Sequence, residues 1–237
     1  MGGRSNERKP WAVPEFLAEP EDPDRRDWAA TVLQTYFHDR RDAGDPLYTG
    51  AAFDRLAGGG DAPKVANRFT ADDLSAVTML SVSVDPRAAL RMLETEADDL
   101  SALLAKIPAE LDLIDADNHQ IGPDSPADEL WRRVDRYHPV GETTTSKLLA
   151  RKRPRLLPVI DSVVREVLAI TWSGDYWRQM RDYLREESPR WEFLRAAHAA
   201  AGLADGISLL RCFDVLLWMS RQPGCPPPSW GTRHSPA

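Results

Sequence analysis

The feature that most restricts the fold of this chain is a helix-start signal that recurs along it. Ser125-Pro126, Ser188-Pro189 and Asp85-Pro86 each place a capping side chain before a proline at the first helical position. The capping oxygen accepts hydrogen bonds from free N–H groups of the first turn, where proline loses nothing. Thr70 followed by Asp73 has the form of a capping box. Apolar residues then recur at helical spacing after each signal, which predicts a series of capped helices.

Strand patterns are scarce, and residues 78–84 are the only ambiguous segment. After Gly206, the apolar residues from Ile207 to Leu217 cover a broad helical face and predict a core helix. Trp191 and Trp218 lie on apolar helix faces and are expected in the core. We therefore predict an all-α fold of about eight to ten helices.

The ordered part is predicted to be one domain over residues 26–222. Residues 1–25 are rich in Pro, Glu, Asp and Arg without an apolar period, which is typical of a flexible leader. Residues 223–237 are rich in proline, which cannot continue a helix, and are predicted to be a flexible tail. The run Gly58-Gly59-Gly60 lacks the Lys-Ser/Thr of a phosphate-binding loop and is interpreted as a flexible loop.

Composition excludes several classes of protein. The longest nearly uncharged stretches, residues 76–84 and 215–220, are far shorter than the roughly 20 apolar residues that span a bilayer. The N-terminus also lacks the apolar segment of a secretory signal, so we expect a cytoplasmic protein without a membrane partner. Cys212 and Cys225 are expected to be unpaired, and no metal site is expected because no closely spaced His/Cys or His/Glu pattern occurs.

The acidic net charge of −7 hides a basic segment. Residues 139–165 contain six Lys and Arg against Glu142 and Asp161, a net charge of +4, so the rest of the chain carries −11. Five of these cations fall within residues 147–155, more than helix capping requires. The segment joins two predicted helices through a short hairpin, whose free N–H groups suit phosphate whatever the base sequence. Binding of double-stranded DNA is therefore predicted in spite of the acidic total.

The same segment resembles a known family. Residues 140–149, VGETTTSKLL, are followed without a gap by a crossing to residues 158–165, PVIDSVVR. This order is similar to the signature of the helix-hairpin-helix (HhH-GPD) DNA glycosylase superfamily, in which a Gly-Val-Gly hairpin precedes a Val-Asp-Thr-His-Val-like segment. Residues 69–81 also resemble an early core helix of that fold. Within the superfamily the pattern resembles an uncharacterised bacterial branch.

The resemblance implies a monofunctional base-excision glycosylase, a hydrolase that acts on the N-glycosyl bond of a flipped base. It places Asp161 at the catalytic carboxylate, which stabilises positive charge on the deoxyribose, and it implies a DNA-repair role and a monovalent cation held by hairpin carbonyls. The residues expected to contact DNA share the hairpin and the helix after it: His138, Val140, Gly141, Glu142, Thr143, Thr144, Lys147, Arg151, Lys152 and Arg153. The aromatic candidates for opening the duplex are Trp131, Tyr137, Trp172 and Trp177.

Three positions depart from the family pattern. Pro139 replaces the first hairpin glycine and removes a backbone donor. Thr143 stands where lyase-active members carry a Schiff-base lysine, so lyase activity is not expected. Val163 replaces the histidine of the Val-Asp-Thr-His-like segment.

Two other interpretations stay open. In the first, Asp161 is only the N-cap of the next helix, worth about 1 kcal/mol, in a non-catalytic DNA-binding or protein-interaction module. In the second, the protein is an enzyme of free nucleotides or nucleosides that uses the same carboxylate without the basic segment. The segment Tyr48-Thr49-Gly50 with Phe53 is interpreted as a turn with an aromatic core anchor rather than a cleft lining. The base recognised and the oligomeric state are left open.

Overall fold

The fold is all-α in the part of the chain that the computed structural model describes, residues 11–170, 175–185 and 189–230. Within these ranges there is no strand, only one isolated bridge between Arg40 and Pro46, and residues 78–84 form none. The all-α prediction is confirmed for these residues. The α-helices of the described ranges are α1 (Pro23–His38), α2 (Ala71–Ala76), α3 (Pro86–Leu90), α4 (Ala97–Leu104), α5 (Asn118–Ile121), α6 (Pro126–Asp135), α7 (Gly141–Lys152), α8 (Ser162–Val167), α9 (Tyr176–Arg185), α10 (Arg190–Ala200) and α11 (Leu209–Met219).

The predicted caps form as the sequence indicates wherever they are described. Thr70 and Asp73 make the reciprocal capping box of α2, Asp85 caps α3 and Ser125 caps α6. Ser188 lies outside the described residues, and α10 follows Pro189 without a side-chain cap. Helix α2 is short, and after Ala76 the chain tightens into the 3-10 turn η4 (Val77–Leu80).

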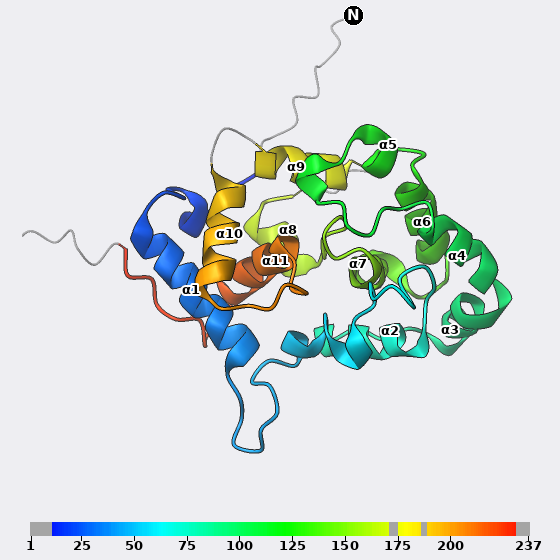
Figure 1. The fold of residues 1–237 in the computed structure, drawn as a ribbon, viewed down its shortest axis with the longest axis horizontal. Helices are drawn as coiled ribbons and strands as arrows, with labels where there is room; N and C mark the ends of the chain where they lie inside the picture. Colours follow the sequence, from blue (N-terminus) through cyan, green and yellow to red (C-terminus); the bar gives the residue numbers. More distant parts are fainter. Residues whose placement is uncertain (1–10, 171–174, 186–188, 231–237) are drawn as a thin grey trace, which may run out of the picture.

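The helices pack as two groups that meet around α7. In one group α1 packs against α10 and α11, and α11 packs against α8. In the other, α4 packs on α6, α6 on α7, and α7 on α2 and η4. Figure 1 shows α7 near the middle of the molecule, with α1, α10, α11 and α8 to its left, α6 and α4 to its right, and α2 below it.

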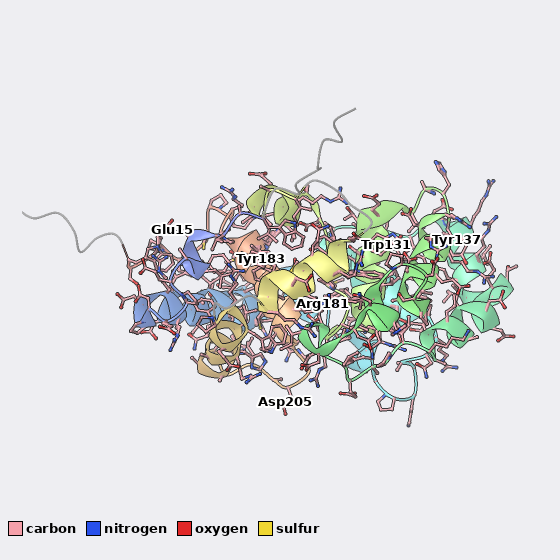
Figure 2. All side chains as sticks on the ribbon, turned by 90° about the horizontal axis from the view of Figure 1, so that it is seen from above. Glu15, Trp131, Tyr137, Arg181, Tyr183 and Asp205 are labelled. Atoms are coloured by element: carbon pink, nitrogen blue, oxygen red, sulfur yellow. The ribbon has the colours of Figure 1, made fainter. Side chains whose placement is uncertain are left out.

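Helix α9 ties distant segments of the chain together. Arg181 Nη1 donates to the carbonyl of Ala116 at 3.1 Å, and the Tyr183 hydroxyl donates to the carbonyl of Ala12 at 3.3 Å. Figure 2 shows these two residues on the central helix, between Glu15 at one end of the molecule and Trp131 toward the other. The segment before α1 is thus held against the helical body.

The two ends of the domain extend further than predicted. Phe16, in the 3-10 turn η1 (Glu15–Leu17), is buried in the core, and α1 begins inside the predicted leader. At the other end, Trp28 Nε1 donates to the carbonyl of Pro226 at 2.8 Å and its ring meets Trp230 edge-on at 5.1 Å. The boundaries at 26 and 222 are therefore wrong for residues 11–25 and 223–230, because isolated aromatic residues anchor these polar, proline-rich segments. Residues 1–10 and 231–237 lie outside the described ranges.

Candidate functional site

A cleft of about 540 Å³ is lined by residues of both helix groups. Its titratable side chains include Asp161 at the start of α8, Lys147 on α7 and Asp214 on α11. The cleft therefore gathers charged groups that lie far apart in the sequence.

Asp161 is both a helix cap and a lining residue of the cleft. Its Oδ1 accepts hydrogen bonds from the backbone N–H groups of Val163 and Val164, each at 3.0 Å. This geometry confirms that Asp161 caps α8. Because the half-buried side chain also lines the cleft, capping leaves the carboxylate available to a ligand.

Lys147 lies one helical turn after Thr143 on α7, and both residues line the cleft. Residues four apart share a helix face. Lys147 Nζ donates to the carbonyl of Leu80 at 2.8 Å. Burial lowers the pKa of its ammonium group, and the nearby carboxylates of Asp161 and Asp214 oppose that shift. Lys147 is 6% exposed and lines the cleft rather than an outer surface, and its contact with DNA stays a prediction.

Arg211, which itself lines the cleft, holds together a buried polar cluster. Its Nε donates to Asp54 Oδ2 at 3.1 Å, its Nη1 to Asp214 Oδ2, and its Nη2 to the Tyr36 hydroxyl at 2.8 Å. Burial raises the pKa of Asp214 to about 6, although the charge of Arg211 acts against this shift. Asp214 was not among the site residues predicted from the sequence. A lone carboxylate within the apolar run Leu209–Met219 was the available signal.

One wall of the cleft is aromatic. The Tyr48 ring stacks on Tyr36 at 5.3 Å with 10° between the planes, and Trp218 meets Tyr48 edge-on at 5.7 Å. Trp218 was expected in the core but is only half-buried and lines the cleft. Phe53 is buried, as predicted for an aromatic core anchor. Tyr48, Thr49 and Gly50, however, line the cleft, which is the role that the sequence did not favour for them. A flat ligand thus meets aromatic surface and charged groups in the same cleft.

The predicted basic surface is not formed by the C-terminal turn of α7. The residues Arg151, Lys152 and Arg153 are exposed by only 2%, 0% and 0%. Their assignment as contacts to DNA phosphates is therefore wrong, because the side chains point into the protein and are engaged there.

Each of these three cations donates to at least one carbonyl group of the chain between residues 53 and 67. Arg151 donates to the carbonyls of Phe53 and Leu56, and Lys152 Nζ donates to that of Val65 at 2.9 Å. Arg153 donates to the carbonyls of Ala66 and Ile107, each at 2.8 Å. The cations therefore satisfy backbone groups of an irregular segment that would otherwise be buried without partners.

The glycine run is part of this packing rather than a free loop. Gly59 and Gly60 are buried, and a Cβ at Gly60 would lie 2.5 Å from the carbonyl oxygen of Arg151. The backbone approaches α7 so closely here that only glycine fits. The interpretation of Gly58-Gly59-Gly60 as a flexible loop is corrected for Gly59 and Gly60.

The hairpin itself reaches the surface. His138 and Gly141 are exposed, and Gly141 has φ +68°, a left-handed conformation that favours glycine at the reversal between α6 and α7. Val140 and Thr144 are buried, so their side chains are not exposed for DNA contact. Glu142 is engaged by Arg165 Nη2 at 2.6 Å.

The monovalent cation implied by the resemblance gains no further support. The carbonyls of Arg136 and Tyr137 already accept hydrogen bonds from His138 N at 2.9 Å and Val140 N at 2.7 Å. We assign no role to a cation here.

The aromatic candidates for opening a duplex lie away from the cleft lining. Trp131 and Trp177 meet edge-on at 5.7 Å, and the Tyr137 hydroxyl donates to Glu96 Oε2 at 2.8 Å. Trp172 lies outside the described residues. The contacts of Trp131, Trp177 and Tyr137 are therefore those of residues that pack within the protein.

Exposed positive charge next to the hairpin comes from α6 and the residue after it. Arg132, Arg133 and Arg136 line a shallow hollow of about 480 Å³. Arg132 pairs with Asp128 at 2.9 Å and Arg133 with Glu96 at 2.9 Å, whereas Arg136 is exposed and forms no ion pair with a described residue. Arg136 is therefore a cation near the hairpin that is available to an external anion.

Comparison with known proteins gives a family but no activity. Residues 29–221 match a family of unknown function (DUF6308), and the chain belongs to this family. No curated protein and no solved structure matches the chain. None of the helices in the described ranges has the length and apolarity needed to cross a membrane. Among the same residues, no group of three or more His, Cys, Asp or Glu side chains is arranged to hold a metal ion.

Proposed function

We propose that the cleft hydrolyses the N-glycosidic bond of a nucleotide whose base has been turned out of duplex DNA. The observation that carries this proposal is the position of Asp161: a carboxylate fixed by two amide N–H groups that also lines a ligand-sized cleft. Its place at the start of α8, after the hairpin, α7 and a short crossing, agrees with the resemblance to helix-hairpin-helix glycosylases.

The chemistry suits a fixed carboxylate. As the base departs, positive charge develops on the sugar, and an anion held in place stabilises that charge more in the transition state than in the ground state. The cleft volume of about 540 Å³ falls within the range of roughly 300–1,000 Å³ typical of small-molecule sites. Tyr48 and Trp218 offer aromatic surface to a base.

Contact with DNA would use fewer cations than the sequence predicts. The exposed hairpin backbone around Gly141 and the side chain of Arg136 are the groups available for phosphate contact, since Arg151, Lys152 and Arg153 are buried. The affinity for duplex is therefore expected to fall less steeply with salt than a five-cation surface would give.

A second candidate function is hydrolysis of free nucleosides. The burial of the three cations at the end of α7 favours it, because a free nucleoside needs no phosphate-binding surface. The same carboxylate and the same aromatic wall would serve this reaction.

Base release is the direct test. The full-length protein is incubated with duplexes carrying damaged or modified bases and, separately, with free nucleosides, and the released base is quantified by chromatography. We expect release by the wild type and loss of at least about 100-fold in Asp161→Asn. Asn retains a capping oxygen, so the thermal unfolding midpoint should change little. No release from any substrate overturns the proposal and favours the non-catalytic interpretation.

A matched control separates capping from chemistry. Asp85 caps α3 through a hydrogen bond from Arg87 N at 2.9 Å and lies outside the cleft lining. Asp85→Asn should leave base release unchanged. An equal loss in both variants would mean that Asp161 acts only as a cap.

Charge reversal at Arg136 distinguishes the two substrates. Arg136→Glu should weaken duplex binding several-fold, measured by fluorescence anisotropy, and leave nucleoside hydrolysis intact. Arg195→Glu, an exposed position on α10, is the control. Unchanged duplex affinity in Arg136→Glu, together with nucleoside cleavage, would favour the second candidate.

A further inference from the structure

The cleft contains a second carboxylate whose setting differs from that of Asp161. Asp214 comes from α11, which packs against α8, the helix that Asp161 caps. We propose that Asp214 is a further catalytic residue, which donates a proton to the departing base while Asp161 stabilises the positive charge on the sugar. This proposal rests on the proposed function.

The hydrogen bonds of Asp214 leave one oxygen available. Arg211 Nη1 donates to Oδ2, and none of the described residues donates a hydrogen bond to Oδ1. Since Asp214 lines the cleft, Oδ1 is the oxygen positioned to meet a ligand. Arg211 is itself fixed by Asp54, Tyr36 and the Gly50 carbonyl, so the carboxyl group is held in one orientation.

Charged and titratable groups face Asp214 from several elements. Arg211 lies on its own helix, Lys147 on α7 and Asp161 at the start of α8. The charge of Asp214 also acts on the hydroxyls of Tyr36 on α1 and Tyr176 on α9, where it contributes to raising their pKa. Asp54 lies on the other side of Arg211. Burial outweighs the opposing effect of Arg211 and raises the pKa of Asp214 to about 6.

The environments of the two carboxylates therefore favour different roles. Asp161 accepts two amide hydrogen bonds, which suit an anion, whereas buried Asp214 retains its proton to higher pH. Pairs of carboxyl groups whose environments differ in this way divide acid and base roles between them.

The reaction balances with water as the only co-reactant. The bond between the sugar C1′ and the base nitrogen breaks, its electron pair stays with the base, and the Asp214 proton passes to a base nitrogen. The oxygen of a water molecule bonds to C1′, and the proton it loses passes to Asp161. Solvent then returns Asp161 and Asp214 to their starting protonation states, and a neutral base and a sugar hydroxyl have formed.

Leaving-group dependence tests the assignment. Base release is measured for a neutral purine that the wild type cleaves and for the same unit carrying N7-methylguanine, which departs without protonation. Asp214→Asn should slow release of the neutral base at least about 100-fold and that of N7-methylguanine less than about 10-fold. Asp161→Asn should slow both. Equal effects of Asp214→Asn on the two substrates, or none, overturn the assignment.

Asp54→Asn is the matched control, because Asp54 is a buried carboxylate on the same Arg211 that lies outside the cleft lining. Since Asp54 helps to fix Arg211 but does not itself line the cleft, its loss should change the rates on the two bases by the same factor and leave the leaving-group dependence within about threefold of wild type. If it reproduces the Asp214→Asn pattern, loss of Arg211 positioning explains the effect and the assignment fails.

A pH profile of the wild type needs no variant that might unfold. The rate on the neutral base should fall as pH rises through the pKa of about 6, and the rate on N7-methylguanine should lack this fall. The same fall with both bases, or with neither, contradicts proton donation by Asp214. If the wild type releases neither base, the proposed function itself fails, so the two failures are distinguishable.

Discussion

Lys152 Nζ lies 2.9 Å from Asp73 Oδ2, and the two side chains are 0% and 1% exposed. Asp73 also accepts a hydrogen bond from Arg151 Nε at 3.3 Å and from Thr70 N at 2.9 Å. One carboxylate thus completes the capping box of α2 and neutralises two buried cations of α7. The capping box that the sequence predicts therefore also supplies the counter-charge for two buried cations.

Removing this carboxylate should destabilise the protein strongly. Asp73→Asn leaves the cations of Arg151 and Lys152 buried without a counter-charge, a change that typically costs about 3–5 kcal/mol. Urea unfolding followed by circular dichroism measures the loss. Asp72→Asn, at the exposed neighbouring position, should stay within about 0.5 kcal/mol of wild type. Similar values for the two variants would show that the buried ion pairs are not needed for stability.

The close approach at Gly60 gives a second prediction. A Cβ there would lie 2.5 Å from the Arg151 carbonyl oxygen and 2.7 Å from Asp73 Oδ1, so either the loop or α7 must move. We expect Gly60→Ala to lower the free energy of unfolding by about 1–3 kcal/mol. Gly206→Ala is the control, because a Cβ at Gly206 meets nothing within 4 Å. A Gly60→Ala variant as stable as wild type would mean that the loop relaxes without cost.

The two cysteines should differ in reactivity. Burial raises the pKa of both thiols, but Cys212 is fully buried in α11, whereas Cys225 is partly exposed. Because the thiolate is the reactive form, an aromatic disulfide reagent should label Cys225 in the native protein and Cys212 only after unfolding. The released thiolate, followed by absorbance, should give one rapid equivalent that Cys225→Ser abolishes. Two rapid equivalents in the native protein would contradict the burial of Cys212.

Local features of the fold were predictable from the sequence, because a cap and the N–H groups it binds lie within three residues of each other. Ser125, Asp85 and Thr70 therefore cap the helices that their neighbours indicate. The basic segment shows the limit of such reasoning. Arg153 binds the carbonyls of Ala66, Leu104 and Ile107, which lie tens of residues away in the chain.

Of the two carboxylates in the candidate site, one could be predicted from the sequence and the other could not. The resemblance singled out Asp161, and its cap geometry is encoded by the residues that follow it. Asp214 belongs to the same cleft only because α11 packs against α8, a tertiary contact that no local pattern carries. A charged residue within an apolar helix marks an unusual position, but its partners Arg211, Lys147 and Asp161 become visible only in the folded chain.

The pH dependence of stability should reveal the buried carboxyl of Asp214. Its pKa rises from an ordinary value of 3.8 to about 6 in the folded protein, mainly through burial. The folded state then binds the proton more tightly than the unfolded state, so this contribution to stability is complete below about pH 4 and is lost as pH rises through 6. Asp214→Asn cannot bind this proton. The free energy of unfolding of wild type minus that of the variant should therefore fall by on the order of 2–3 kcal/mol between pH 4 and pH 7.

Urea unfolding of both proteins at several pH values measures this difference and cancels the titration of groups that they share. Asp54→Asn should show a trend of the same sign, because burial also raises the pKa of Asp54 on the opposite side of Arg211. A difference that stays constant from pH 4 to pH 7, or that rises, would mean that the Arg211 ion pair holds Asp214 ionised throughout. In that case the carboxyl would carry no proton to deliver near neutral pH, and its assigned part in releasing the base would fail together with the stability prediction.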